Sequence, residues 1–219
     1  MWEGYAYGTG GGYVSQKLEI LTIGHSTLSY DHFLDLLRSA GVTAVADVRS
    51  TPYSKHFPHF ARDLLQAELS ADRVTYRYLG QKLGGRPTSK ALYCDGVADY
   101  EKMAQTDSFR LGLEEIVKGG KKHRLAIMCS EYDPLDCHRC LLVGRSLSAH
   151  GVSVGHIRSK GDIESQEQVE ERLLRHEAHH GDDLFCSREE LLTLAYRKHT
   201  QKVAYREPTI IRPDKIAAE

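Results

Sequence analysis

Short apolar segments alternate with amphipathic segments from residue 18 to residue 157, and this alternation constrains the fold more than any other feature of the chain. Each apolar segment has about six residues, which is too short for a buried helix and fits a buried strand. We therefore predict strands at residues 18–23, 43–48, 74–79, 123–128 and 152–157.

The segments between these strands have the spacing of amphipathic helices. In residues 30–40, for example, Phe33, Leu34 and Leu37 lie on one side before Gly41 ends the helix. Further helices are predicted at residues 60–69, 100–117 and 138–149. Strands that alternate with helices form parallel sheets that are covered on both faces. The predicted fold is therefore α/β, a Rossmann-like three-layer sandwich with a mostly parallel sheet and a C-terminal helical appendage.

The predicted domain organisation follows from where the alternation starts and stops. Residues 1–17 are rich in glycine and tyrosine without periodicity and are predicted to form a flexible leader. Residues 18–160 form the α/β domain. Residues 161–219 are predicted to be a helical extension, in which Ser187 and Glu190 have the spacing of a capping box.

Composition sets limits on partners and location. The net charge is −1 with histidine neutral, so no overall positive charge indicates nucleic acid, although a local site stays open. No apolar run approaches about 18 residues, and the start of the chain lacks a signal-peptide pattern, so we expect a cytoplasmic protein without a membrane partner. Five cysteines fit a reducing compartment better than a disulfide framework. The oligomeric state is not predicted.

The strongest chemical signal follows the predicted strand at residues 123–128. Cys129 and Glu131 point to the same side of an extended chain, and Cys137 comes at the start of the next helical segment. A thiol near cations or a helix start can become a nucleophile, and a carboxylate beside it can act as general acid or base. Cys129 or Cys137 is therefore a candidate nucleophile or redox centre, and Glu131 a candidate proton carrier. Alternatively, Cys129 is a small buried hydrophobe.

Groups that could hold an anion lie after other strands, in a glycine-rich loop and at the helix start. Their charges and hydroxyls are suited to phosphate or carboxylate. These candidates are Arg49, Ser50, Lys55, Arg86, His138 and Arg139. His25 follows the first strand, titrates near neutral pH and is a further catalytic candidate. The alternative for Arg49 is a structural network with Asp47, and the alternative for Arg86 is an ordinary turn.

Metal binding is an alternative use of the same residues. Cys129, Cys137, His138 and Cys140 offer soft donors, but their spacing is not that of a zinc finger or ribbon, and no metal site is assigned. Residues 176–180 match the H-E-x-x-H pattern of zinc proteases. Their polar surroundings and their position at a helix end favour adventitious metal binding over a catalytic zinc.

Four sequence blocks occur in order along the chain. They are Gly24-His25-Ser26, Asp47-Val48-Arg49-Ser50 with Pro52, Leu83-Gly84-Gly85, and Cys129-x-Glu131 followed by Cys137-His138-Arg139. With these blocks, residues 18–157 resemble the domain of unknown function 488 (DUF488) family. The resemblance implies a shared fold and a set of shared residues, but no established reaction.

We therefore predict an enzyme that acts on a small anionic or nucleotide-like substrate at the carboxyl ends of the strands. Two alternatives remain open. One is a non-catalytic module that binds a nucleotide or a nucleic-acid end, and the other is a metal-binding protein based on cysteine and histidine. The sequence identifies neither the cofactor nor the substrate nor the reaction.

Overall fold

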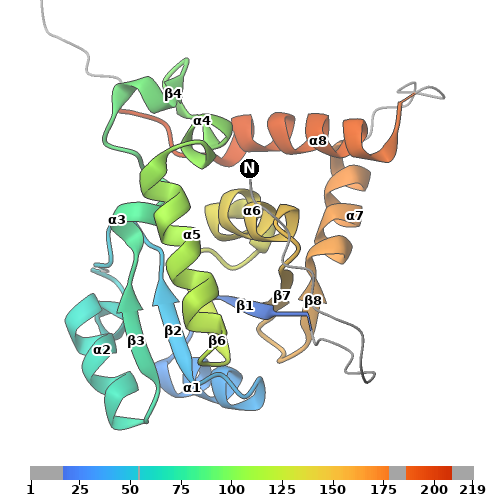
Figure 1. Cartoon of the computed structure of the whole chain (residues 1–219). Coiled ribbons are helices and arrows are strands. Elements are labelled where there is room, and N and C mark those ends of the chain that lie inside the picture. The colour runs from blue at the N-terminus through green and yellow to red at the C-terminus, as the bar shows by residue number, and fades with distance from the viewer. Residues whose placement is uncertain (1–16, 54, 178–185, 209–219) are drawn as a thin grey trace, which may run out of the picture.

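A six-stranded sheet forms the centre of the computed structural model, which describes residues 17–53, 55–177 and 186–208 (Figure 1). The strand order is β3-β2-β6-β1-β7-β8. The strands are β1 (Glu19–Gly24), β2 (Ala44–Asp47), β3 (Thr75–Tyr78), β6 (Leu125–Cys129), β7 (Ser153–Ile157) and β8 (Ile163–Ser165). All neighbours pair in parallel except β8, which is antiparallel to β7. The mostly parallel sheet confirms the predicted fold class.

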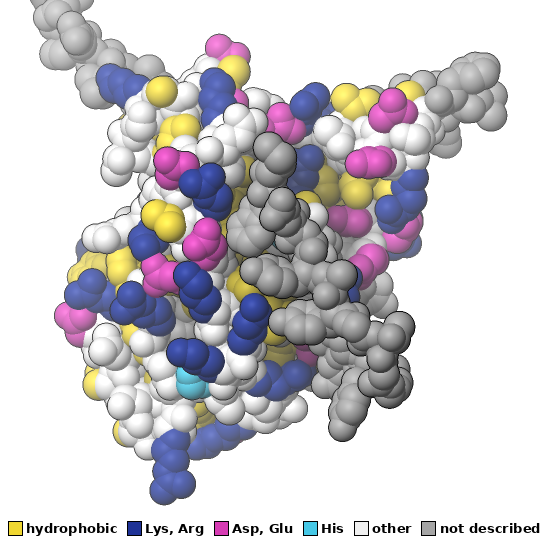
Figure 2. Space-filling model, viewed as in Figure 1, with side chains coloured by type: hydrophobic (Ala, Val, Ile, Leu, Met, Phe, Trp, Pro, Cys, Tyr) yellow, Lys and Arg dark blue, Asp and Glu magenta, His cyan; other side chains and the backbone are white. Residues whose placement is uncertain are grey.

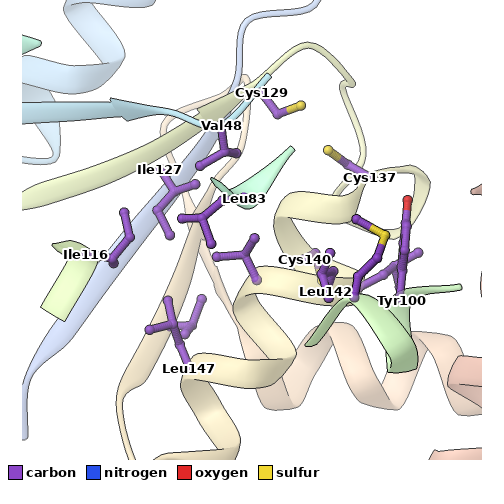
Figure 3. Close-up of a cluster of buried hydrophobic side chains, with 14 of the residues drawn as sticks. Val48, Leu83, Tyr100, Ile116, Ile127, Cys129, Cys137, Cys140, Leu142 and Leu147 are labelled. Carbon is purple, nitrogen blue, oxygen red and sulfur yellow. The ribbon is translucent and has the colours of Figure 1, made fainter. Parts of the chain in front are cut away.

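Helices cover both faces of the sheet. On one face, α1 (Tyr30–Ser39) and α2 (Arg62–Ala71) pack their buried leucine and phenylalanine side chains against Leu21, Val45 and Met128. On the other face, α5 (Asp107–Gly120) and α6 (Arg145–Ala149) belong to a larger cluster with Ile127 (Figure 3). Two separate apolar clusters, one on each face, give the three layers that the sequence predicted.

The described part of the C-terminal extension is built into the second cluster. Residues 163–165 form strand β8 rather than the start of a helix, and α7 (Gln166–Glu177) follows directly. Leu173 of α7 and Tyr196 of α8 (Arg188–Val203) are buried against the domain. The predicted capping box of Ser187 and Glu190 is present at the start of α8. The predicted leader, apart from Lys17, lies outside the described residues.

Two of the predicted helices are interrupted. The segment at residues 100–117 is divided into α4 (Tyr100–Ala104) and α5, because the Thr106 side chain caps the start of α5. The helix predicted at residues 138–149 begins with a π-helical turn, η4 (Arg139–Gly144), before α6. A π-helical turn is rare and is frequently found at functional sites.

The remaining elements are short. They are α3 (Gly80–Leu83), the 3₁₀ turns η1 (Pro58–Phe60), η2 (Lys90–Leu92) and η3 (Pro134–Asp136), and a hairpin of β4 (Tyr93–Cys94) with β5 (Val97–Ala98). Within the described ranges, no helix is both long and apolar enough to cross a membrane.

The surface around α5 is rich in lysine and arginine, with acidic side chains among them (Figure 2). Around α5, Lys82 of α3 and Arg77 of β3 contact Glu115 of the helix, and Arg110 contacts Asp107 within the helix. The positive charges on this face are therefore partly neutralised within the chain.

Candidate functional site

The carboxyl ends of three neighbouring strands bring the predicted site residues together. Strand β6 lies between β1 and β2, with Cys129 paired to Gly24 and Met128 paired to Asp47. The chain then leaves the three strands at the same edge of the sheet, where open α/β folds bind ligands. Gly24 is required there, because a Cβ atom would overlap the carbonyl oxygen of Glu131.

Arg49 is a buried cation that is held by Asp47. Its Nε lies 2.9 Å from Oδ1 and its Nη2 lies 2.6 Å from Oδ2 of Asp47, and both side chains are almost fully buried. Tyr76 donates a further hydrogen bond, of 2.7 Å, to the same carboxylate. The structural network that the sequence left as an alternative therefore exists, and it fixes the direction of the guanidinium group.

His25 supports Arg49 from the side. Its Nδ1 lies 3.0 Å from the Ser26 carbonyl oxygen, so Nδ1–H donates there, and Nε2 can accept from Arg49 Nη1 at 3.2 Å. The ring stacks on Phe60 with centroids 4.2 Å apart. Burial and the nearby Arg49 charge lower the pKa of His25 to about 4, so the ring is neutral at physiological pH.

Two cysteines and a carboxylate form a cluster after β6. The sulfur atoms of Cys129 and Cys137 lie 3.1 Å and 2.8 Å from the same oxygen of Glu131. Figure 3 shows that Cys129 and Cys137 point toward one another from the end of β6 and the start of the next helical segment. Both cysteines are buried, as expected if Cys129 were only a small buried hydrophobe. The sulfur of Cys129 also contacts polar groups, which a purely apolar role does not explain.

His138 completes this cluster. Its Nε2 lies 3.0 Å from the Val48 carbonyl oxygen, so Nε2–H donates there and leaves Nδ1 as the other ring donor or acceptor. Nδ1 lies 3.7 Å from the sulfur of Cys129 and 3.9 Å from that of Cys137. Gly85 packs closely on the ring, since a Cβ atom there would come within 2.8 Å of the His138 ring.

Arg139 is a second buried cation, but it has different partners. Its Nη1 and Nη2 donate to the carbonyl oxygens of Glu131 and Tyr132, at 2.7 Å and 3.1 Å. Its backbone N–H donates to the sulfur of Cys137 at 3.4 Å. Among the described residues, its Nε has no hydrogen-bond partner and no carboxylate forms an ion pair with it. The positive charge of Arg139 therefore acts mainly on the thiol cluster.

The surroundings shift the pKa values of Cys129 and Cys137 in opposite directions. Burial raises the pKa of Cys129 well above its usual value, and the negative charge of Cys137 adds to this effect. Burial also opposes ionisation of Cys137, but the hydrogen bond from Cys129 and the charge of Arg139 outweigh it and hold the pKa of Cys137 well below its usual value. Burial and the charge of Cys137 raise the pKa of Glu131. The cluster therefore favours one thiolate, on Cys137, beside a carboxyl group that retains a proton more readily than usual.

A cavity of about 390 Å³ opens beside these groups. Of the residues predicted from sequence, six border it: Arg49, Ser50, Arg86, Cys129, Glu131 and His138. Cys137, Arg139 and His25 are not in the cavity wall and lie behind it, in contact with wall residues. Lys55 is exposed and does not border the cavity.

Arg86 and Ser50 are joined by a hydrogen bond in the wall of the cavity. The Ser50 hydroxyl accepts a hydrogen bond of 3.0 Å from the backbone N–H of Arg86, and the exposed Arg86 guanidinium lies over the ring of Tyr205. Both residues also border a second hollow of about 430 Å³, which is lined in part by Lys82, Gln81 and Phe109. The glycine-rich loop that carries Arg86 is therefore a shared wall rather than an isolated turn.

Several residues of the cavity wall were not predicted from the sequence. They are Thr51, Tyr53, Tyr100, Ser130, Asp136, Val203 and Tyr205. Asp136 sits one residue before Cys137, so its position beside the motif was the available signal. Val203 and Tyr205 come from the C-terminal extension, more than sixty residues after the motif, and no local pattern marks them.

Comparison with protein-family models matches residues 29–145 to the domain of unknown function DUF488, which covers more than half of the chain. The chain belongs to the DUF488 family. No match was found among curated proteins or among solved structures.

The DUF488 match includes most of the cavity wall. Arg49, Glu131 and the Cys137-His138-Arg139 block lie inside the matched range, whereas His25 and Tyr205 lie outside it. The cluster of Cys129, Glu131, Cys137 and His138 and the Arg49 ion pair thus lie within the DUF488 region. The wall contributed by the extension belongs to the rest of the chain.

Among the residues that the structure describes, two groups of side chains have donor atoms close enough to hold a metal ion. Cys129, Glu131, Cys137 and His138 each offer one atom, and these atoms lie within 4.8 Å of one another. Cys140, which the sequence placed in this alternative, instead has its sulfur 3.8 Å from Gln166. Glu131 takes its place, because it shares one side of the extended chain with Cys129.

The other group lies in the extension, where His176 and Glu177 meet His199. Glu177 is buried and is contacted by Lys202 Nζ at 2.7 Å and by His199 Nδ1 at 2.9 Å. Its carboxylate therefore joins α7 to α8. The rest of the H-E-x-x-H match, at residues 178–180, lies outside the described residues.

Proposed function

We propose that this DUF488 protein is an enzyme that acts on a small anionic substrate, of the nucleotide or phosphorylated-metabolite class, in the 390 Å³ cavity. One observation carries the proposal: the fixed cation Arg49 and the cluster of Cys129, Glu131 and His138 border the same cavity. A concave site that joins a fixed charge to groups capable of proton transfer and nucleophilic attack is the arrangement expected of an active site.

Arg49 is prepared to bind an anion without rearrangement. Three of its five N–H groups are used by Asp47 and His25, so one N–H on each terminal nitrogen remains for a ligand. The ion pair with Asp47 holds the guanidinium in place, which lowers the entropy that binding costs. Arg86 supplies a second guanidinium to the wall of the same cavity.

The cluster supplies the chemical step. Cys129 is the sulfur that borders the cavity, and Glu131 is close enough to exchange a proton with it or with a bound substrate. Cys137 and Arg139 act through these groups from behind the wall, because Cys137 contacts Glu131 and Arg139 holds the Glu131 backbone. The site thus separates substrate binding, at Arg49 and Arg86, from reactivity, at Cys129 and Glu131.

Calorimetric titration with pyrophosphate and with nucleoside mono-, di- and triphosphates tests the binding half of the proposal. Arg86→Ala should weaken the affinity about tenfold or more, which corresponds to one lost charge-assisted hydrogen bond, while the melting temperature changes little. Arg110→Ala removes an equally exposed cation that borders neither cavity and serves as the matched control.

Incubation of any ligand found in this way, followed by mass spectrometry, tests the catalytic half. Turnover that is lost in Glu131→Gln but kept in Arg110→Ala supports an enzyme. Binding without turnover favours the non-catalytic module. Equal affinity in the wild-type protein and Arg86→Ala contradicts the assigned anion site.

A further inference from the structure

The cluster beside the cavity has the geometry of a metal centre. We propose that Cys129, Glu131, Cys137 and His138 bind one zinc ion or a similar divalent transition metal. In tetrahedral zinc sites the metal lies about 2.3 Å from sulfur and about 2.0–2.2 Å from nitrogen or oxygen, which places ligand atoms roughly 3.3–3.8 Å apart. The sulfur-to-oxygen distances here are 3.1 Å and 2.8 Å, and the sulfur-to-nitrogen distances are 3.7 Å and 3.9 Å. The sulfur-to-nitrogen distances already fit a tetrahedron to within about 0.4 Å, and the sulfur-to-oxygen distances would lengthen by about 0.5–0.8 Å when the metal binds.

The second observation is the orientation of His138. Histidines that bind metals usually donate their other ring N–H to a carbonyl or carboxylate, which fixes the ring and the tautomer. His138 Nε2 lies 3.0 Å from the Val48 carbonyl oxygen, and Nδ1 is left facing the two sulfur atoms. Arg139 adds a backbone N–H to the sulfur of Cys137, which stabilises a metal-bound thiolate in the same way.

The third observation is the charge around the cluster. Two thiolates and one carboxylate would carry three negative charges, and a divalent ion would reduce this sum to one. The buried guanidinium of Arg139, whose side chain pairs with carbonyl oxygens rather than a carboxylate in the described structure, balances that remaining charge. The cluster and Arg139 together are therefore neutral when a divalent metal is bound.

A disulfide between Cys129 and Cys137 is the competing use of the two sulfur atoms. It explains why the cysteines are adjacent, but it gives no reason for a carboxylate oxygen and an imidazole nitrogen to face the same point. All four donor atoms are instead of the types that bind zinc in proteins. Metal binding also accounts for their burial, because the ion compensates groups that are costly to bury alone.

The metal would lie at the wall of the cavity. Cys129, Glu131 and His138 border it, so a bound substrate could reach the ion. Four protein ligands fill a tetrahedral site, so the metal would act on the anionic substrate as a Lewis acid by expanding to five-coordinate, and Cys129 would serve as a ligand rather than as a nucleophile. This catalytic role rests on the proposed function, whereas the metal site itself does not.

The experiment measures metal in the full-length protein, purified reduced and without a histidine tag or chelator. Elemental analysis should find about one zinc per chain, and exchange into Co²⁺ should give the visible and near-ultraviolet absorption of a tetrahedral cobalt thiolate. Binding should release the protons that remain on the ligand groups, so the affinity should fall in acid.

Variants identify the ligands. Cys129→Ser and Cys137→Ser should each lower the metal content about tenfold or more, whereas Cys94→Ser, which changes an exposed cysteine away from the cluster, should keep it. Circular dichroism checks the fold, and chelation of the wild-type protein followed by Co²⁺ titration gives the same answer if a variant does not fold.

Three results would overturn the metal site. They are reduced protein that binds neither Zn²⁺ nor Co²⁺, a metal content that the cysteine variants leave unchanged, and a metal that is lost only in His176→Ala. None of these results bears on anion binding by Arg86, so failure of the metal site and failure of the proposed function are distinguishable.

Discussion

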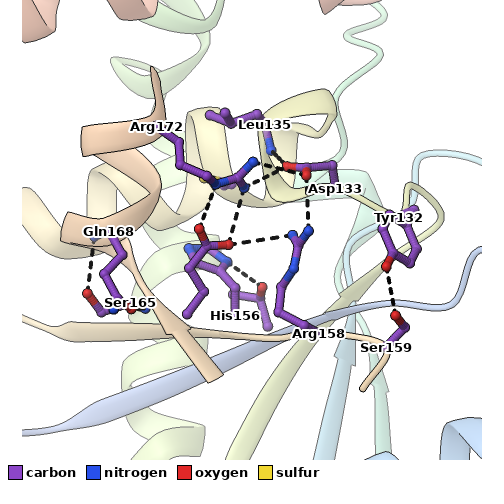
Figure 4. A network of polar contacts seen from close by, with 12 residues as sticks. Tyr132, Asp133, Leu135, His156, Arg158, Ser159, Ser165, Gln168 and Arg172 are labelled. Atoms are coloured by element: carbon purple, nitrogen blue, oxygen red, sulfur yellow. Dashed lines mark hydrogen bonds and ion pairs between the residues drawn. The ribbon is translucent and has the colours of Figure 1, made fainter. Parts of the chain in front are cut away.

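Two networks of charged side chains in the described structure, one half-buried and one buried, are built on opposite principles. Behind the C-terminal extension, Arg172 contacts Asp133 at 2.9 Å and Glu164 at 2.6 Å, and Arg158 contacts Asp133 at 3.1 Å (Figure 4). Each cation there meets carboxylates. At the cavity, Arg139 meets carbonyl oxygens and a sulfur, and the charges of the cluster are not matched by carboxylate–cation pairs within it.

The difference distinguishes ion pairs that stabilise the fold from charged groups that belong to a candidate functional site. Where the extension meets the domain, the hydrogen bonds from Arg172 outweigh burial and hold the pKa of Asp133 well below its usual range, as expected of a satisfied ion pair. At the cavity, burial raises the pKa of Glu131 and its neighbours share one negative charge. A shifted pKa on a group that lacks an oppositely charged side chain as its ion-pair partner is typical of functional sites.

Among the described residues, Arg49 is the cavity cation that has a carboxylate partner, and its removal should have the largest effect. Arg49→Ala leaves the fully buried Asp47 uncompensated, so the free energy of unfolding should fall by about 3–5 kcal/mol. Urea denaturation measures the change. The double variant Asp47→Ala with Arg49→Ala removes both charges and should recover part of the loss. A wild-type midpoint for Arg49→Ala would show that the pair does not stabilise the fold.

A smaller effect is expected from the extension network. Asp133→Ala removes the bonds to Arg158 and Arg172 and the cap on the Leu135 N–H, so it should cost about 2 kcal/mol. Zinc content and anion affinity should remain as in the wild type, because the network does not border the cavity. Chemical denaturation combined with elemental analysis checks both expectations. Loss of metal in stably folded Asp133→Ala would mean that the two regions are not separate.

The pH dependence of folding stability tests a third buried group, His156, which lies where the extension meets the domain and carries no charge in the folded protein. His156 lies between the Thr22 hydroxyl and the Gln166 side chain, and burial together with the charge of Arg139 lowers its pKa to about 3. The unfolded chain therefore binds a proton that the folded chain does not bind between about pH 6.5 and pH 3. Stability should fall as the pH falls through this window, by at most about 1.4 kcal/mol per pH unit for this group.

A matched variant isolates that contribution. The stability difference between the wild type and His156→Gln should be constant above about pH 7 and should shrink as the pH falls below 6.5. Urea denaturation at a series of pH values gives both curves. Parallel curves across the whole range would exclude His156 as the group responsible.

Much of the fold could be predicted because its signals are local. The five predicted strands correspond to β1, β2, β3, β6 and β7, since each is a short apolar or β-branched segment next to an amphipathic helix. Strand β8 was missed because three residues, Ile163–Ser165, are too few to show a period. The break between α4 and α5 was missed because Thr106 acts as a cap through its own side-chain hydrogen bond rather than through glycine or proline.

The site was predictable only in part, because it is assembled from distant segments. Strand ends identified Arg49, Cys129 and Glu131 as neighbours, since parallel strands finish at one edge of the sheet. The cluster contains Glu131 and not Cys140 because the turn of η4 directs the Cys140 side chain to Gln166, away from Cys129 and Cys137. The contribution of Tyr205 depends on tertiary packing of the extension, for which the sequence has no period.

Anomalous X-ray diffraction at the zinc absorption edge, from crystals of the protein grown with Zn²⁺ and pyrophosphate, tests the central claim most directly. We expect one strong peak within bonding distance of Cys129, Cys137 and His138, and pyrophosphate density against Arg49 and Arg86 in the adjoining cavity. An anomalous peak confined to His176, Glu177 and His199, or a Cys129–Cys137 disulfide with no ligand in the cavity, would contradict it.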